Sequence, residues 1–197
     1  MNLVERAQKI ILQPQQEWYV IQQEPTPPAQ IYTNYIIPLA AIGPVARIIG
    51  LMLFGLSIFV GPLTGLLPYA IVGSILMFAL DLGSVYVMAL IIDGLAPSFQ
   101  GHKNFNQAFK VAAYCKTPAW LGGIFYLIPS LGFLGALLGL YSLYLLYLGL
   151  PILMHSPPDK AIGYTAVVII AAIVITIIVF SIVGAVTAAM FFGARGI

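Results

Sequence analysis

The chain has 197 residues, of which 61% are hydrophobic and only 7% are charged, and its mean hydropathy is +1.01. This composition excludes an ordinary soluble protein and predicts one membrane domain. The formal net charge of +2 is too small and too dispersed to indicate nucleic acid as a partner, and a single cysteine excludes an intramolecular disulfide.

The first 34 residues are polar and lack the apolar core of a signal peptide, so we expect an N-terminal segment on the cytoplasmic or interfacial side of the membrane. Residues 2–12 have the spacing of a short amphipathic helix that ends before Pro14. Such a helix would either lie on the membrane surface or dock on the membrane-spanning helices, and the sequence leaves both open. The proline-rich stretch 22–30 predicts an extended linker.

Residues 35–197 predict an all-α membrane domain of five transmembrane helices. Apolar segments of sufficient length separate at polar or proline-containing breaks, with a tight turn expected at Gly61-Pro62 and Gly65. The five predicted spans cover about residues 35–60, 66–92, 105–127, 131–154 and 164–192.

The distribution of Lys and Arg predicts the orientation of these spans, because cytoplasmic loops are enriched in both residues. Only Arg195 falls on the opposite side from the N-terminus. We therefore expect a cytoplasmic N-terminus and a C-terminus outside. The cations on the N-terminal side are Arg6, Lys9, Lys103, Lys110 and Lys160.

Charged residues inside the predicted spans are costly and normally face a partner or a wet cavity. Counting about 1.5 Å per residue from the predicted span ends, Lys116 lies roughly 13–15 Å deep and Arg47 roughly 18 Å deep. Asp81 reaches roughly 10 Å on the same scale and is the carboxylate able to compensate Lys116, Arg47 or both, so we expect the two cations to share it. Nearer the surface, Asp93 and Lys110 are predicted to form a second, wetter pair.

Aromatic and helix-bending residues accompany these charges. Tyr141 and Tyr144 lie on one broad face of the predicted fourth span, where Tyr141 would face Lys116. Kinks are expected at Pro38, Pro44 and Pro118, because proline removes a helical hydrogen bond. Two interpretations stay open: an internal polar clamp that fixes helix register, or the lining of a cavity for an ion or small anion. We favour the clamp, because the sequence shows no inverted repeat.

Small residues predict close helix packing. Gly135 and Gly139 form a GxxxG motif, and Gly184 with Ala188 repeats its spacing, which is compatible with a homo-oligomer.

Sites for catalysis, metals and cofactors are not indicated. Cys115 beside Lys116 is expected to be a buried, inert thiol, and His102 and His155 lack metal-ligand spacing within one element. The sequence shows no catalytic triad, phosphate-binding loop or zinc-protease motif, so we expect neither an enzyme nor a cofactor.

Short motifs along nearly the whole chain resemble the bacterial branch of the Yip-one domain family, the Ypt/Rab-interacting-protein family. The N-terminal motifs are Pro14, Glu17-Trp18, Ile21, Glu24, Tyr32, Tyr35 and residues 38–42. The later motifs are Tyr114, Thr117-Pro118, Trp120, Ile128-Pro129, residues 139–141, 144–146, 149–151 and 158–160, and Tyr164.

The resemblance implies a five-helix protein of the bacterial cytoplasmic (inner) membrane with a cytoplasmic N-terminus. Eukaryotic members are linked to Rab GTPases and vesicle traffic, and carry an acidic Asp-Leu-Tyr-Gly-Pro segment that this chain lacks. The leading hypothesis is a non-enzymatic membrane scaffold or membrane-organising protein that contacts the lipid bilayer, a cytoplasmic protein partner or copies of itself. The alternative is a small channel or transporter that uses the Arg47, Asp81 and Lys116 cluster.

Overall fold

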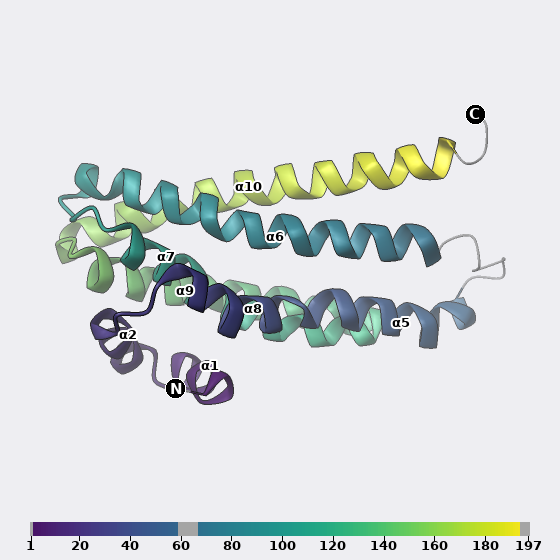
Figure 1. Cartoon of the computed structure of the whole chain (residues 1–197), viewed down its shortest axis with the longest axis horizontal. Coiled ribbons are helices and arrows are strands. Elements are labelled where there is room, and N and C mark those ends of the chain that lie inside the picture. The colour runs from purple at the N-terminus through teal and green to yellow at the C-terminus, as the bar shows by residue number, and fades with distance from the viewer. Residues whose placement is uncertain (1, 59–66, 194–197) are drawn as a thin grey trace.

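The computed structural model describes residues 2–58 and 67–193, and these residues form helices and no β-strand (Figure 1). This confirms the predicted all-α class. The expected turn at Gly61-Pro62 and Gly65, and Arg195, lie outside the described residues.

Two short helices at the N-terminus fold back on each other as a hairpin. The first, α1 (Leu3–Leu12), is capped by Asn2, whose side chain accepts a hydrogen bond from the Val4 amide at 3.3 Å. The second, α2 (Pro14–Gln23), starts with a proline, which has no amide hydrogen to leave unsatisfied in the first turn. The chain is extended from Glu24 to Pro27. The predicted linker is thus shorter than residues 22–30, because α2 reaches Gln23 and the next helix starts at Pro28.

The first long helical path is interrupted twice. It consists of α3 (Pro28–Ile31), a π-helical turn η1 (Tyr32–Ile36), α4 (Ile37–Ala40) and α5 (Ile42–Ile58). The π-turn ends two residues before Pro38, and the second interruption lies at Ala41, three residues before Pro44. A proline ring clashes with the carbonyl one turn earlier, so a widened turn before it relieves that clash.

The second and last long helices lie side by side. Helix α6 (Leu67–Leu95) continues into a 3₁₀ turn, η3 (Ala96–Phe99), and α10 (Pro158–Gly193) runs along it to the C-terminal end (Figure 1). At one end of the pair, Phe99 stacks on Tyr164 with ring centroids 4.8 Å apart. The Tyr164 hydroxyl donates to the Ile92 carbonyl at 2.5 Å, which fixes α10 against α6.

The predicted third span is broken into short pieces. These are α7 (Phe105–Tyr114), α8 (Thr117–Gly122) and the 3₁₀ turns η4 (Gly123–Leu127) and η5 (Pro129–Leu131). The α-helix ends at Tyr114 and restarts two residues later, with Pro118 in the first turn of α8. The chain then enters the continuous helix α9 (Gly132–Met154).

Four helical segments of the described chain are long and apolar enough to cross a membrane. The predicted count of five is therefore not confirmed, because the segment between α6 and α9 lacks a continuous helix of sufficient length. The first segment also begins earlier than the predicted residue 35. The four segments are Pro28–Leu53, Pro68–Phe99, Gly132–Met154 and Pro158–Phe192.

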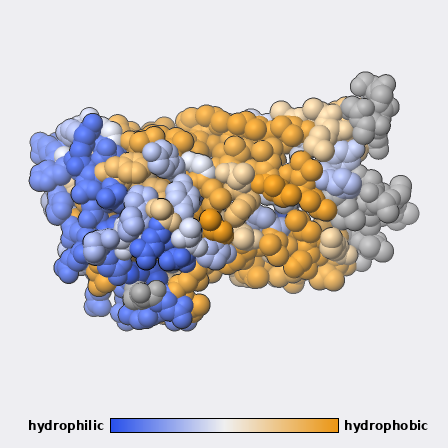
Figure 2. All heavy atoms as spheres, in the orientation of Figure 1, coloured by the Kyte–Doolittle hydropathy of each residue, from blue (hydrophilic) through white to orange (hydrophobic). Residues whose placement is uncertain are grey.

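Polar and apolar surfaces separate along the long axis of the molecule. Hydrophilic residues gather over the end that carries α1, α2 and the start of α10, which we call the polar end, while the long helices form an apolar belt (Figure 2). The N-terminal hairpin belongs to this bundle rather than lying apart from it, since Ile10, Trp18 and Ile21 are fully buried in its hydrophobic core. Of the two options that the sequence left open for α1, the structure shows docking.

Glycines allow three backbone segments to meet closely. A Cβ atom built on Gly123 would lie 2.6 Å from Gly43 Cα, and one on Gly50 would lie 2.5 Å from the Leu127 carbonyl oxygen. Gly135 of the GxxxG motif faces Gly122, whose carbonyl oxygen is 3.0 Å from such an atom. In contrast, a Cβ on Gly139 or Gly184 meets nothing within 4 Å among the described residues.

This difference predicts that the two glycines of the GxxxG motif tolerate substitution differently. Gly135→Leu should lower the free energy of unfolding by about 1–3 kcal/mol, because the side chain must displace the Gly122 backbone. The same substitution at Gly139 enters open space and should have little effect. Thermal unfolding of both variants in detergent measures the difference, and equal destabilisation would contradict the packing of α9 described above.

Candidate functional site

A buried charge cluster joins the N-terminal hairpin to the bundle. Arg6 is 4% exposed and lies between two carboxylates, those of Glu17 on α2 and Glu24 just after it. The Arg6 guanidinium donates to Glu17 Oε1 at 2.5 Å and also to Glu24 Oε1. Arginine suits this position because its guanidinium can donate to two carboxylates at once and stays ionised.

Lys110 of α7 completes this group, which we call the Arg6 cluster (Arg6, Glu17, Glu24 and Lys110). Its buried ammonium group donates to the carbonyl oxygens of Ile21 at 2.9 Å and Glu24 at 2.5 Å. These carbonyls lie at the C-terminal end of α2, where helical carbonyls lack partners and the helix dipole favours a positive charge. Lys110 therefore caps α2 and ties it to α7.

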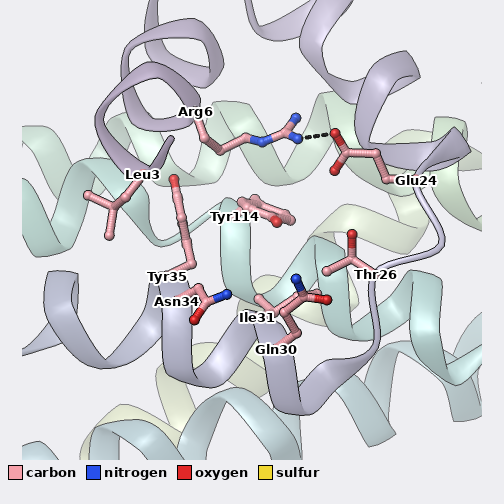
Figure 3. A pocket seen from close by; sticks show the side chains of 9 residues that line it. All are labelled: Leu3, Arg6, Glu24, Thr26, Gln30, Ile31, Asn34, Tyr35 and Tyr114. Atoms are coloured by element: carbon pink, nitrogen blue, oxygen red, sulfur yellow. Dashed lines mark hydrogen bonds and ion pairs between the residues drawn. The ribbon is translucent and has the colours of Figure 1, made fainter. Parts of the chain in front are cut away.

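A small polar cavity of about 100 Å³ opens beside Arg6 (Figure 3). The Arg6 side chain reaches across it to Glu24, and its guanidinium carbon lies 5.6 Å from the centre of the Tyr114 ring. That distance allows a cation–π contact. The cavity is lined by Leu3, Arg6, Glu24, Thr26, Gln30, Ile31, Asn34, Tyr35 and Tyr114.

Packing and further hydrogen bonds hold the hairpin on α9. The Trp18 ring covers Gly149 so closely that a Cβ at this position would lie 2.8 Å from ring carbons. Gln22 donates to the Ile152 carbonyl at 2.5 Å, and the Tyr141 hydroxyl donates to the Ile11 carbonyl at 2.8 Å. Both bonds satisfy main-chain carbonyls near helix ends, so the hairpin is fixed by backbone contacts as well as by charge.

A second charge cluster lies between α6 and the break after α7. Lys116, in the break, pairs with Asp81 Oδ1 and contacts Ser84 Oγ at 3.1 Å. The indole nitrogen of Trp120 donates to Asp81 Oδ2 at 2.7 Å. Both carboxylate oxygens thus have partners, and the lysine lies 5.6 Å from the Trp120 ring centre. We call Asp81, Ser84, Lys116 and Trp120 the α6–α8 clamp.

The structure brings Asp81 and Lys116 together but leaves the other predicted members apart. Arg47 is exposed on α5 and makes no ion pair with a described residue, so the predicted sharing of Asp81 by two cations is wrong. Tyr141 bonds to α1 instead of facing Lys116, and Tyr144 is 45% exposed with its ring against that of Tyr141. The aromatic partner of Lys116 is Trp120.

The predicted surface pair of Asp93 and Lys110 is also wrong. Lys110 reaches the C-terminal end of α2, where its ammonium group donates to two carbonyl oxygens. Asp93 lies near the end of α6, and its Oδ1 is buried without a hydrogen-bond partner among the described residues. The Lys110 ammonium group, which was predicted to pair with Asp93, instead binds carbonyl oxygens at the end of the N-terminal hairpin.

The structure gives no support for a metal site or a reactive thiol among the described residues. The rings of His102 and His155 lie 5.7 Å apart, but the part of the chain that the structure describes holds no group of three His, Cys, Asp or Glu side chains suited to a metal ion. Cys115 is buried, and its thiol lies 3.5 Å from the Ala112 carbonyl.

The sequence interpretation missed the Arg6 cluster, because Arg6 looks like part of the solvated face of an amphipathic helix. Only the hairpin between α1 and α2 brings Arg6 next to Glu17, eleven positions further on, and Glu24, eighteen positions further on. A signal was nevertheless present: Glu17 and Glu24 are among the residues that carry the family resemblance.

One family model and two relatives match the sequence of this chain. The Yip1 domain matches residues 9–181 of the chain. The chain belongs to the Yip1 family. It is also 27% identical over 158 residues to inner membrane protein YohC of Escherichia coli strain K12 and, with the same figures, to that of E. coli O6:H1 strain CFT073. These matches cover 78% of this chain and 80% of each relative, whereas no solved structure matches.

Membership of the Yip1 family gives the motif residues a physical interpretation. In this chain, Glu17 binds Arg6, and Trp18 packs on Gly149. The Tyr35 hydroxyl lies 2.7 Å from Thr117 Oγ1, which itself donates to the Tyr114 carbonyl at the end of α7. The short motifs therefore meet in space, where they hold the N-terminal hairpin and the broken α7–α8 segment together.

The α6–α8 clamp predicts that loss of its cation destabilises the bundle. Lys116→Met leaves the Asp81 carboxylate with Trp120 as its side-chain partner and should lower the free energy of unfolding by about 1–3 kcal/mol. Arg47→Met is the matched control, because Arg47 makes no ion pair with a described residue. Thermal unfolding in detergent is the measurement, and equal effects of the two changes would contradict the clamp.

The Arg6 cluster predicts a larger effect. Arg6→Met leaves two carboxylates without their cation, one of them buried, and should cost about 3–5 kcal/mol. Lys9→Met is the control on the same helix: Lys9 pairs with Glu5 at 2.7 Å in solvent, where it lowers the pKa of Glu5. If both variants unfold at the same temperature as the unchanged protein, Arg6 does not hold the hairpin.

Proposed function

We propose that this Yip1-family protein is a non-enzymatic membrane scaffold whose N-terminal hairpin forms a fixed platform for a protein partner. The observation that carries the proposal is the buried Arg6 cluster, which joins α1, α2 and α7. A helix that served only as a membrane-surface anchor would not need a buried arginine held by two carboxylates.

The outer side of the platform offers apolar side chains for a partner. Leu12 is 76% exposed, and Val4 and Tyr19 are more than half exposed. Glu5 and Lys9 lie beside them as an exposed ion pair, so this surface combines apolar contact with mixed charge. That composition is typical of a protein-binding surface with a hydrophobic centre and a polar rim.

We place the polar end in the cytoplasm and the protein in the bacterial inner membrane. Arg6 and Lys9 lie on α1 and Lys110 contacts the end of α2, both helices of the polar end, and Lys103 and Lys160 lie in or next to the loops there. This is the distribution that the positive-inside rule requires. The relative YohC is named an inner membrane protein. We further propose that α7, α8 and η4 together form the fifth crossing, because α6 ends at the polar end and α9 returns to it (Figure 1).

The alternative function, a channel or transporter at the intramembrane charges, has less support. Lys116 and both carboxylate oxygens of Asp81 are occupied by partners within the protein, and Arg47 does not join them. A transported ion would have to displace these contacts. We therefore assign the α6–α8 clamp a structural role, and self-association of the chain stays a prediction.

Site-specific photo-crosslinking tests the platform directly. A photoreactive amino acid at Leu12 should give a discrete protein adduct in the native membrane, and the same label at Ile170, an exposed position on α10, should not. The adduct should disappear in the Arg6→Met background, which releases the hairpin while leaving the label in place. An adduct that persists with Arg6→Met, or that forms equally at Ile170, would contradict the proposal.

A further inference from the structure

A second cavity lies on another face of the polar end, between α2, the last turns of α9 and the first turn of α10. Its volume is about 650 Å³, in the range of pockets that hold small organic ligands. Two candidate membrane-spanning helices meet here, since α9 ends at Met154 and α10 starts at Pro158. The cavity therefore lies beside the ends of two candidate membrane-spanning helices, at the polar end.

The lining changes from polar to apolar in a way that suits an amphipathic ligand. Gln22, His155 and Ser156 provide hydrogen-bonding groups, while Leu148 and Ile152 provide aliphatic surface. Tyr19 and Tyr147, both exposed, also line it. Tyrosines with one wet and one apolar end are typical of the membrane–water interface.

One buried hydroxyl in this cavity lacks a partner. Ser156 is 5% exposed, and its Oγ makes no hydrogen bond with any described residue, although the side chain lines the cavity. A buried hydroxyl without a partner costs free energy, so such groups normally meet a ligand or water. The neighbouring His155 is held in place by Gln22, whose amide nitrogen lies 3.3 Å from His155 Nε2.

We propose that this cavity binds the headgroup of a membrane phospholipid, with its phosphate at Ser156 and His155 and its glycerol and upper acyl chains along Leu148 and Ile152. The cavity is partly open and is bordered by exposed tyrosines of the kind found at a membrane interface, where phospholipid is the abundant amphipathic molecule. Tyr19 borders both this site and the proposed partner platform, but Ser156, His155, Leu148 and Ile152 lie outside the platform.

The experiment uses the full chain in detergent with three probes. These are dioctanoyl phosphatidylethanolamine, dioctanoylglycerol, which lacks the phosphate, and glycerol 3-phosphate, which lacks the chains. The phospholipid should raise the unfolding temperature in a saturable way, because a ligand that binds the folded state stabilises it. The other two should bind at least tenfold more weakly. Equal binding of either one, or no saturable effect of the phospholipid, would overturn the proposal.

Single-atom substitution locates the site. Ser156→Ala should weaken phospholipid binding about five- to tenfold, because it removes one hydrogen bond to the phosphate. The unliganded variant should be at least as stable as the unchanged protein, since the lost hydroxyl has no partner. Ser130→Ala, at an exposed position beyond the other end of α9, is the matched control and should bind normally.

A second variant, at His155, tests whether Ser156→Ala weakens binding only indirectly. His155 has a left-handed backbone with φ of 53°, which asparagine also adopts readily, so His155→Asn should fold normally. It should likewise weaken binding of the phospholipid without altering that of dioctanoylglycerol. Unchanged phospholipid binding in both Ser156→Ala and His155→Asn would show that the cavity is not the binding site.

Discussion

The pairing of a buried arginine with two glutamates is the interaction on which the arrangement of the N-terminal half depends. A charge removed from water must meet a partner, and this chain has only eight basic and six acidic residues with which to satisfy that requirement. Arg6 is nearly inaccessible to solvent. If α1 left the bundle, the carboxylates of Glu17 and Glu24 would lose the cation that they bind. The hairpin is thus a structural part of the membrane domain.

The same requirement applies to the backbone where the helices are interrupted. The break between α7 and α8 leaves carbonyl groups without helical partners, and Thr117 bonds to that of Tyr114 while Tyr35 bonds to Thr117. The π-turn in η1 carries Tyr32, whose hydroxyl donates to the Leu82 carbonyl at 2.9 Å. Irregular backbone is tolerated within a membrane protein where protein groups satisfy it, and here Thr117 does so at the break while Tyr32 and Tyr35 tie the first helical path to α6 and α8.

The sequence predicted the membrane class, the positions of most long helices and the contact between Asp81 and Lys116. That contact was predictable because the apolar segments contain very few charged residues, so few ion pairs between them are possible. The position of Arg47 was not predictable, because depth along a helix says nothing about the direction in which a side chain points. Counting along the predicted span put Arg47 within reach of Asp81, but Arg47 lies on the exposed side of α5.

The Arg6 cluster was not predictable for a different reason. Residues 2–12 place polar and apolar residues on opposite faces, as a surface helix does, and the fold-back of α2 supplies the carboxylate that meets Arg6 in the interior. The partner of Lys110 was unpredictable for the same reason. Asp93 was the nearest carboxylate by predicted depth, whereas the Lys110 ammonium group binds carbonyl oxygens at the C-terminal end of α2. Tertiary contacts between segments far apart in the sequence decide both cases.

Hydrogen–deuterium exchange tests most directly whether the N-terminal hairpin is a fixed part of the bundle. Peptides covering residues 10–21, which contain the fully buried Ile10, Trp18 and Ile21, should exchange as slowly as those covering residues 108–114 of the buried helix α7. Exchange of residues 10–21 at the rate of an unstructured chain, with α7 still protected, would contradict the account.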